Sequence, residues 1–380
     1  MPFVLDQAGL TQLVQVVIQG GAGQPGRGGQ FSHGHALATG LHEQSEQRKP
    51  VFVGQGREAF QGGIRFHISR IIELNAFVKA WMTVACYLGF RHHSLYLDGK
   101  IYTHERTMPT LSLEFFPPKT DKQRAQFDSA LPQLRALDPE YASVTFGAGG
   151  STLSYTPQTV KALMQAGLDA APHLSCMGGT RAEIGTLLDE YKAMGCRRLV
   201  ALRGDMPSGM AGPGDFGFAS ELVAFIREHS GDHFHVEVAC YPETHPQADD
   251  ALADMRHFKH KVECGADGAI TQYFFNPDAY FRFVDDARAA GIDIPIVPGI
   301  MPISNFTQLK RFSDSCGAEI PRWIVKRMQA YYDDVESVRA LGADIVAAMC
   351  RRLLQGGAPG LHLYTLNRAV ATLAVVERLA

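Results

Sequence analysis

The chain has 380 residues, of which 46% are hydrophobic and 20% charged, which is enough apolar material for one large domain or two ordinary ones. The formal net charge of −3 provides no basic field of the kind that nucleic acid or an anionic membrane needs, so we expect a small-molecule partner. Seven cysteines, none of them in a C-x-x-C pair, favour reduced thiols in a cytoplasmic protein over a disulfide framework or a zinc ribbon.

The first part of the chain, residues 1–107, lacks the regular alternation of a packed domain. Its run 74–90 is apolar but contains Lys79 and is shorter than the roughly 20 residues of a membrane span. No basic segment precedes an apolar one at the start, so we expect no secretory signal. We therefore expect 1–107 to be a poorly patterned N-terminal extension and not a functional domain. A reading frame opened upstream of a true start near Met108 would have this texture, and a lineage-specific extension is the alternative.

Two patterns resemble binding motifs without their required context. A formal G-x-G-x-x-G occurs at residues 21–26, but further glycines follow it where a dinucleotide-binding fold would begin a helix. Histidine pairs occur at 92–93 and at 233 and 235, and neither has a third ligand at an ordered spacing. We expect no second nucleotide domain and no metal site.

From Met108 onward, short apolar runs alternate with amphipathic stretches of helical period. Helical stretches include 156–167, 181–195, 251–265 and 277–291, and each of these ends in Gly, a common helix C-cap. Eight strands alternating with helices predict an α/β fold, a (β/α)8 TIM barrel, over residues 108–380. An open doubly wound sheet fits less well, because it has fewer strands and a Gly-rich first turn. The predicted strands are 110–116, 141–147, 169–176, 197–205, 235–243, 268–275, 295–302 and 361–367.

Polar residues recur where these strands end, and in a TIM barrel the catalytic groups lie at the C-terminal ends of the strands. Each residue taken singly could simply be a polar group leaving a buried strand. Their recurrence at one end predicts an active site there. The residues are Glu114, Thr145, His173, Arg203 with Asp205, Tyr241 with Glu243, Gln272, and Asn367 with Arg368.

The strand ends read in order EFFPPK, SVTFGAGGS, APHLSC, LRGDMP, YPETHP, ITQYFF, PGIMPISNF and YTLNR. This set resembles the methylenetetrahydrofolate reductase family in its short bacterial form, over all of 108–380. The resemblance implies a barrel that holds FAD at the strand C-termini. FAD would be reduced by NADH or NADPH and reoxidised by 5,10-methylenetetrahydrofolate in a ping-pong reaction that supplies methyl groups for methionine synthesis. It also implies a homo-oligomer.

The resemblance gives catalytic roles to Glu114 and Asp205. Opening the folate's imidazolidine ring requires a proton at N10, and Glu114 matches the family's general acid. An apolar surround, suggested by Leu113 and Phe115, would favour the protonated carboxyl group that this step needs. A salt-bridged structural glutamate is the alternative. Asp205 matches an aspartate beside the flavin and the folate, where its charge would tune the flavin potential; a helix-capping or turn residue is the alternative.

The resemblance also implies two sets of binding residues, with departures from the usual family pattern at Phe218, His257 and His260. On the substrate side, Gln272 suits a pterin edge because an amide both donates and accepts, and Arg368 suits the folate tail carboxylate. The substrate-side residues are Glu114, Asp205, Gln272, Gln308, Phe312 and Arg368. The FAD-binding residues are Thr145, His173, Leu202, Arg203, Gly204, Asp205, Phe218, Ala219, Ala239, Tyr241, His245, Asp254, His257, His260 and Lys261.

Two other functions remain as alternatives. One is a flavin-free pterin-binding barrel that transfers a one-carbon unit, and the other is a non-catalytic folate or flavin binder. Flavin absorbance distinguishes the reductase from the first, and Glu114, Asp205 and Gln272 together disfavour the second.

Overall fold

The computed structural model describes residues 92–97, 100–105, 110–146, 155–177, 179–204, 214–331 and 334–379. The chain divides into two units, Met1–Met108 and Pro109–Ala380. In the first unit the described residues form an antiparallel hairpin of β1 (His92–Leu97) and β2 (Lys100–Glu105). Residues 1–91 lie outside the described residues. They include the formal G-x-G-x-x-G at 21–26 and the apolar run 74–90.

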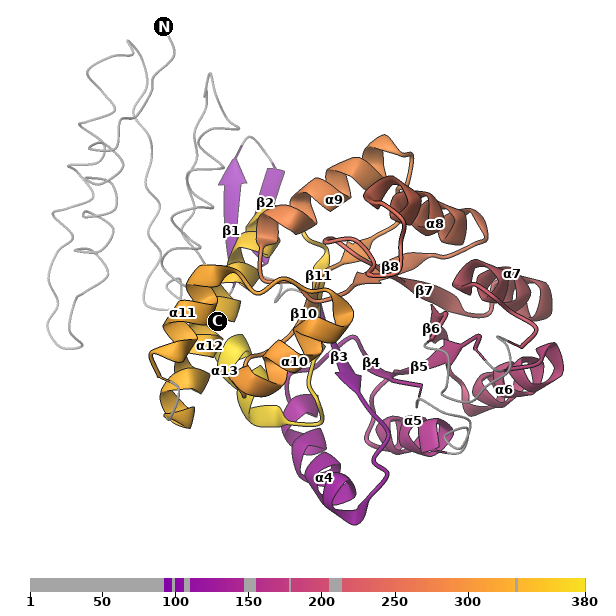
Figure 1. Ribbon diagram of the computed structural model, residues 1–380, viewed down its shortest axis with the longest axis horizontal. Coiled ribbons are helices and arrows are strands. Elements are labelled where there is room, and N and C mark those ends of the chain that lie inside the picture. The colour runs from indigo at the N-terminus through magenta and orange to yellow at the C-terminus, as the bar shows by residue number, and fades with distance from the viewer. Residues whose placement is uncertain are drawn as a thin grey trace, which may run out of the picture. The chain divides into compact units, whose positions relative to one another are not determined.

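The second unit contains a nine-stranded parallel sheet that is rolled into a nearly closed barrel and surrounded by helices (Figure 1). Along the sheet the order is β10-β11-β3-β4-β5-β6-β7-β8-β9. This confirms the predicted TIM-barrel fold. The strands are β3 (Thr110–Phe115), β4 (Tyr141–Val144), β5 (Ala170–Ser175), β6 (Arg198–Leu202), β7 (His235–Cys240), β8 (Gly268–Thr271), β9 (Ile296–Val297), β10 (Gly299–Ile300) and β11 (Gly360–Tyr364).

One predicted strand, 295–302, is divided into the short strands β9 and β10 at Pro298. β9 pairs with β8 and β10 pairs with β11, so the two pieces join the ends of the sheet. Proline cannot donate a ladder hydrogen bond, which accounts for the break. Gly299 follows because a Cβ there would lie 2.2 Å from the carbonyl oxygen of Thr271.

Helices follow the strands around the barrel, and all four helical stretches named from the sequence are confirmed as α5, α6, α8 and α9. A capping box of Thr180 and Glu183 begins α6, and Gly195 ends it in the left-handed conformation. The helices are α4 (Asp121–Arg135), α5 (Tyr155–Gln165), α6 (Arg181–Met194), α7 (Ala219–Ser230), α8 (Ala251–Glu263), α9 (Pro277–Ala289), α10 (Phe306–Cys316), α11 (Arg322–Gln329), α12 (Val335–Gln355) and α13 (Ala369–Glu377).

The strands have two different faces because successive side chains point to opposite sides. On β3, Leu113 and Phe115 belong to the large apolar core between the sheet and the helices. A separate small cluster, formed by the strand residues Tyr141, Ala171, Val200 and Ile270, fills part of the barrel interior. Residues Ser112 and Glu114 of β3 therefore face the interior, together with the alternate residues of the other strands.

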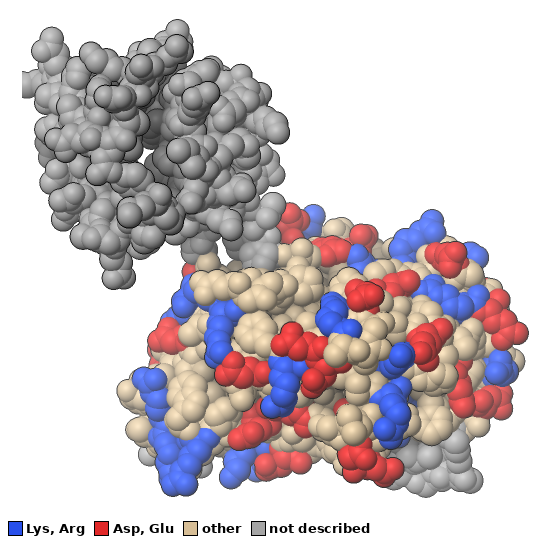
Figure 2. Space-filling view, turned by 90° about the horizontal axis from the view of Figure 1, so that it is seen from above, with Lys and Arg blue, Asp and Glu red and all other residues tan. Residues whose placement is uncertain are grey.

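The outer surface mixes charges of both signs. Figure 2 shows Lys and Arg interspersed with Asp and Glu over the described part of the face in view, without a broad area of one sign. Within the described ranges, no helix combines the length and the apolar character needed to cross a membrane.

Candidate active site

Glu114 lies near the C-terminal end of β3, with its Oε2 between two histidines. His173 Nε2 is 3.5 Å away and His362 Nε2 is 3.6 Å away, and the Glu114 side chain is 19% exposed. Both nitrogens are buried and have no hydrogen-bond partner among the described residues. The prediction that apolar side chains surround the Glu114 carboxyl group is wrong. Leu113 and Phe115 flank Glu114 in sequence but lie on the opposite face of the strand, so the carboxyl group meets imidazoles.

Two side chains that follow β11 hold the backbone around Glu114 in place. The Thr365 hydroxyl donates to the Glu114 carbonyl oxygen at 2.6 Å. The buried Asn367 amide accepts from the backbone N–H of Phe116 at 3.0 Å and donates to its carbonyl oxygen at 2.8 Å. Asn367 has a φ of 53°, a left-handed conformation that asparagine tolerates better than most residues. Asn367, predicted from its strand-end position, thus joins the ends of β11 and β3.

His173 is a neutral imidazole at neutral pH. Burial disfavours its cation and lowers its pKa from 6.5 to about 4; the Glu114 carboxylate opposes this shift, and His362 adds to it. Neutral imidazole keeps one nitrogen as donor and one as acceptor. His173, predicted as a flavin residue, is therefore also placed to exchange a hydrogen bond with Glu114.

The ends of β6 and β7 bring together several predicted cofactor residues. The Ser175 hydroxyl donates to the Arg203 carbonyl oxygen at 2.9 Å, and the Arg203 guanidinium bonds the side chain of Gln247. Gly204 has a φ of +80°, and a Cβ on it would lie 2.1 Å from the Ser175 hydroxyl. Only glycine fits this turn. Asp205, which follows it, lies outside the described residues.

A second group lies where β7 meets α8. Asp254 accepts a hydrogen bond from the backbone N–H of His245 at 2.8 Å, and Lys261 donates to the carbonyl oxygen of Ala239. The rings of Tyr241 and His245 are 4.5 Å apart, edge to face. Burial lowers the pKa of Lys261, opposed by Cys240 and Asp254. These five predicted residues therefore form one connected cluster.

The remaining predicted cofactor residues are more dispersed. Phe218, the N-cap of α7 before Ala219, is 53% exposed, and its ring stacks with His257 at 6.3 Å between centroids. His260 is exposed beside Glu263, 3.9 Å away. Two other residues, Leu202 and Thr145, stand at the ends of β6 and β4: Leu202 packs on the interior cluster, and the Thr145 N–H donates to the Phe115 carbonyl oxygen at 2.9 Å.

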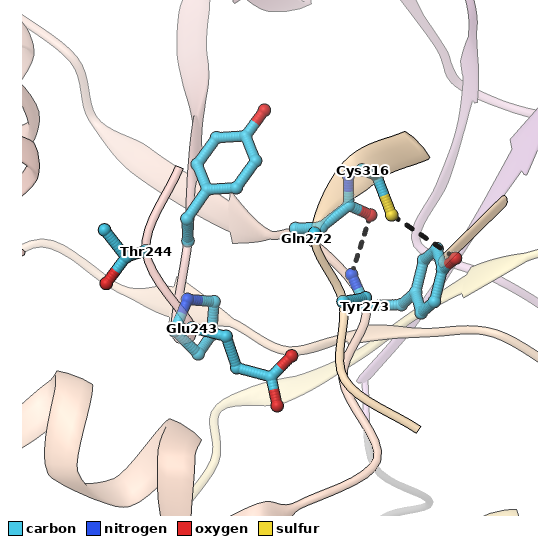
Figure 3. A pocket seen from close by; sticks show the side chains of 9 residues that line it. Glu243, Thr244, Gln272, Tyr273 and Cys316 are labelled. Atoms are coloured by element: carbon cyan, nitrogen blue, oxygen red, sulfur yellow. Dashed lines mark hydrogen bonds between the residues drawn. The ribbon is translucent and has the colours of Figure 1, made fainter. Parts of the chain in front are cut away.

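A pocket opens beside the ends of β7 and β8 (Figure 3). Gln272 lines it, and its side-chain oxygen accepts from the backbone N–H of Tyr273 at 2.9 Å. Glu243 also lines it; burial raises the pKa of its carboxyl group, while the Glu319 N–H donates to it at 2.8 Å. Of the six predicted substrate residues, Gln272 is in the lining; Glu114, Gln308, Phe312 and Arg368 are not, and Asp205 lies outside the described residues. Gln308 and Phe312 lie four residues apart on α10, and Arg368 is the exposed N-cap of α13.

Four interior residues below Glu114 were missed by the sequence analysis: Ser112, Tyr141, Glu237 and His362. All are buried. Alternation along 110–116, 141–147, 235–243 and 361–367 places each on the interior face, which was the available signal. Their mutual contacts depend on strand register, which the sequence pattern leaves open.

No group of three or more His, Cys, Asp or Glu side chains in the described part of the chain is arranged to hold a metal ion. His233 instead contacts Arg197 and the Cys196 carbonyl oxygen, and His235 lies beside Glu237 and Asp267.

Comparison with known proteins identifies the family to which the chain is similar. The methylenetetrahydrofolate reductase family profile matches residues 100–380. The 5,10-methylenetetrahydrofolate reductase of Escherichia coli K12 is 40% identical over 270 residues, covering 71% of this chain and 90% of that protein. Methylenetetrahydrofolate reductase (NADH) 1 of Arabidopsis thaliana is 34% identical over 289 residues, covering 72% and 49%.

A solved structure from Clostridium thermocellum, an uncharacterized protein that binds two copies of 5-methyl-5,6,7,8-tetrahydrofolic acid, aligns with a TM-score of 0.53 at 17% identity. It covers 72% of this chain and 95% of that one. This similarity supports the fold alone. The family match and the sequence identity together show that the chain belongs to the methylenetetrahydrofolate reductase family, whose members are oxidoreductases.

Proposed function

We propose that this protein reduces 5,10-methylenetetrahydrofolate to 5-methyltetrahydrofolate with FAD as cofactor and NADH or NADPH as reductant, in a ping-pong reaction. Family membership supports the folate reaction, and the name of the Arabidopsis relative supports NADH as the reductant. The Clostridium protein, which has a similar fold, binds 5-methyl-5,6,7,8-tetrahydrofolic acid, the product of the proposed reaction. The observation that carries the proposal is the partly buried Glu114 carboxyl group, which lies at the strand ends 3.5 and 3.6 Å from two buried imidazole nitrogens.

Glu114 acts as the general acid. Its carboxyl proton passes to N10 of the folate, the bond between N10 and the methylene carbon breaks, and the resulting N5 iminium carbon accepts hydride. The remaining Glu114 carboxylate is stabilised by imidazole N–H groups of His173 and His362. The neutral state of His173 suits this role, because a cation beside Glu114 would lower the affinity of the carboxylate for its next proton.

The strand ends fit a flavin. His173 Nε2 is a buried polar atom without a hydrogen-bond partner among the described residues. Arg203, His245 and Lys261 would supply donors to the phosphates and sugar hydroxyls, and Phe218 and His257 a stacked aromatic surface. FAD, when bound, supplies the hydride. The other proposed contacts are Thr145, Leu202, Asp205, Ala219, Ala239, Tyr241, Asp254 and His260.

The substrate contacts follow from the chemistry of the folate. Gln272 would pair with the pterin edge, and Arg368 with the carboxylates of the tail. Gln308 and Phe312 would contact the substrate from α10, and Asp205 would oppose added electron density on the flavin. We further propose that residues 108–380 carry the whole reaction and that 1–107 do not contribute to it.

An anaerobic spectrophotometric experiment tests the proposal. Purified protein should show flavin absorbance, lose it on addition of NADH, and regain it on addition of methylenetetrahydrofolate with one 5-methyltetrahydrofolate formed per flavin. A colourless protein that transfers a one-carbon unit would contradict the proposal and support the flavin-free alternative. A yellow protein that NADH bleaches but folate leaves reduced would contradict the assigned substrate.

A further inference from the structure

We propose that a chain of buried side chains through the barrel interior, His362, Ser112, Tyr141 and Glu237, returns a proton to Glu114 from the opposite end of the barrel. This relay, named here by those four residues, rests on the proposed role of Glu114 as the acid. Each turnover removes one proton from Glu114, on the side where cofactor and substrate would lie. A route from the other side would replace it while that side is covered.

Ser112 is the centre of the relay, because it has a partner on each side. In the parallel register, Ser112 pairs with His362 of β11 and with Tyr141 of β4. Ser112 Oγ and His362 Nδ1 are hydrogen bonded at 2.8 Å. Tyr141 lies beside Ser112 on the neighbouring strand, so rotation of the Ser112 hydroxyl can direct it toward the phenol. His362 thus contacts Ser112 through one ring nitrogen and faces Glu114 through the other.

Tyr141 carries the path across the barrel. Its hydroxyl donates to Glu237 Oε2 at 2.5 Å, from β4 to β7, which are three positions apart in the sheet. Burial and the Glu237 charge raise the pKa of the Tyr141 phenol well above its usual range. The phenol therefore stays protonated and passes a proton on only as it receives another.

The far end of the relay reaches solvent. Glu237 Oε1 lies 3.8 Å from Arg198 and 3.9 Å from His235 Nε2, whose side chains are 27% and 37% exposed. Arg198 and His235 are the first residues of β6 and β7, so they lie at the N-terminal end of the barrel. Glu114 lies at the other end. The path therefore spans the barrel.

The proton balance is simple. Water at the N-terminal end gives a proton to Glu237, directly or through His235. Glu237 passes it to the Tyr141 oxygen as Tyr141 gives its own to Ser112; Ser112 protonates His362 Nδ1, and the Nε2 proton moves to Glu114. Rotation of the Glu114 carboxyl group closes the final 3.6 Å. No electrons move. Hydroxyl rotation resets Ser112 and Tyr141, and tautomer exchange returns the His362 proton from Nδ1 to Nε2.

A structural role alone explains this arrangement less well. Barrel interiors are filled mostly by branched apolar side chains, and each buried polar group costs free energy unless it is paired. Here Ser112 is hydrogen bonded to His362 and Tyr141 to Glu237, and the buried His362 Nε2 lies 3.6 Å from Glu114 without a hydrogen-bond partner among the described residues. The other groups that face Glu114 are His173 and Tyr364, and the Tyr364 hydroxyl donates to the Thr271 carbonyl oxygen instead.

The test uses the full chain with FAD bound, reduced beforehand and mixed with methylenetetrahydrofolate in weak buffer containing a pH-indicator dye. Flavin absorbance reports the first turnover, and the dye reports proton uptake. In Tyr141→Phe we expect first-turnover reoxidation at the wild-type rate, because Glu114 is already protonated, and proton uptake slowed at least about tenfold. Imidazole buffer at rising concentration should restore the uptake.

Two variants keep the test decisive. Glu237→Gln still accepts the Tyr141 hydrogen bond but has no carboxyl proton to carry, so it should slow proton uptake similarly. Tyr191→Phe removes a buried phenol of α6 that has no partner among the described residues, and it should leave uptake unchanged. Proton uptake at the wild-type rate in Tyr141→Phe and Glu237→Gln would overturn the relay. First-turnover reoxidation slowed by the same factor as proton uptake would also overturn it.

The relay and the proposed function fail separately. If Glu114→Gln reoxidises at the wild-type rate, Glu114 is not the acid and both ideas fall. If Glu114→Gln is inactive with folate while Tyr141→Phe takes up protons normally, only the relay is wrong.

Discussion

The two faces of the barrel sheet differ in what they contribute. The outer face carries Leu113, Phe115 and their counterparts, which form a continuous apolar core with the helices. The inner face carries Glu114, His173 and His362 with only a small apolar cluster. Apolar packing on the outer face stabilises the barrel whatever the reaction is. The inner face retains buried polar groups at an energetic cost, which agrees with our proposal that they take part in the reaction.

The largest expected loss of stability comes from the outer face. Leu113→Ala should lower the free energy of unfolding by about 2–5 kcal/mol, because it removes a fully buried side chain and leaves a cavity. The folded fraction should keep its rate of flavin reoxidation by folate. Chemical denaturation measures the first effect, with exposed Leu252→Ala as a control that should change little. If Leu113→Ala folded normally but lost most of its reoxidation by folate, the proposed division of roles between the two faces would be wrong.

A pH dependence should come from the inner face. Because His173 is neutral when folded, the unfolded chain binds its proton first, and stability falls as pH drops from 6.5 to about 4. That drop, at about 1.4 kcal/mol per pH unit, amounts to about 3 kcal/mol. Unfolding experiments at pH 7 and pH 4 should show the stability difference between wild type and His173→Gln decreasing by about this amount. A difference independent of pH would show that His173 is not buried as a neutral group.

The junction of β11 and β3 should contribute less. Asn367→Ala removes two hydrogen bonds to Phe116 and leaves its backbone groups without them, at a cost of about 1–3 kcal/mol. Since the same junction holds Glu114, reoxidation by folate should slow as well. Asn367→Asp, which keeps one acceptor, should recover part of the stability. Equal effects of both substitutions would argue against the hydrogen bonds as the cause.

The smallest effect is expected at Ser143. Its buried hydroxyl has no hydrogen-bond partner among the described residues, so Ser143→Ala should change the free energy of unfolding by less than about 1 kcal/mol, and removal of the unpaired group can stabilise the protein. Thermal unfolding of the FAD-loaded protein checks this. A clear loss of stability or of flavin would show that the hydroxyl has a partner in the loaded protein.

The outer face was the predictable one. The spacing of apolar residues, with the glycines that end the helices, was sufficient to place eight strands and the helices that alternate with them. Packing on the outer face depends on that spacing alone. The break at Pro298 was missed because closure of the barrel is a property of the whole sheet. Strand-end positions led us to propose Glu114, His173, Arg203 and Gln272 as site residues. Ser112, Tyr141, Glu237 and His362 needed the register between strands, and Glu114's true neighbours could be found only with it.

The most direct measurement of the central claim is reoxidation of the reduced Glu114→Gln protein by methylenetetrahydrofolate under anaerobic conditions. The substitution keeps the side chain's size and removes its acid. The account predicts that FAD stays bound, that NADH bleaches it at close to the wild-type rate, and that reoxidation by folate slows by about 10²–10⁴-fold. Reoxidation at the wild-type rate, or equal loss of both half-reactions, would contradict the claim that Glu114 supplies the proton.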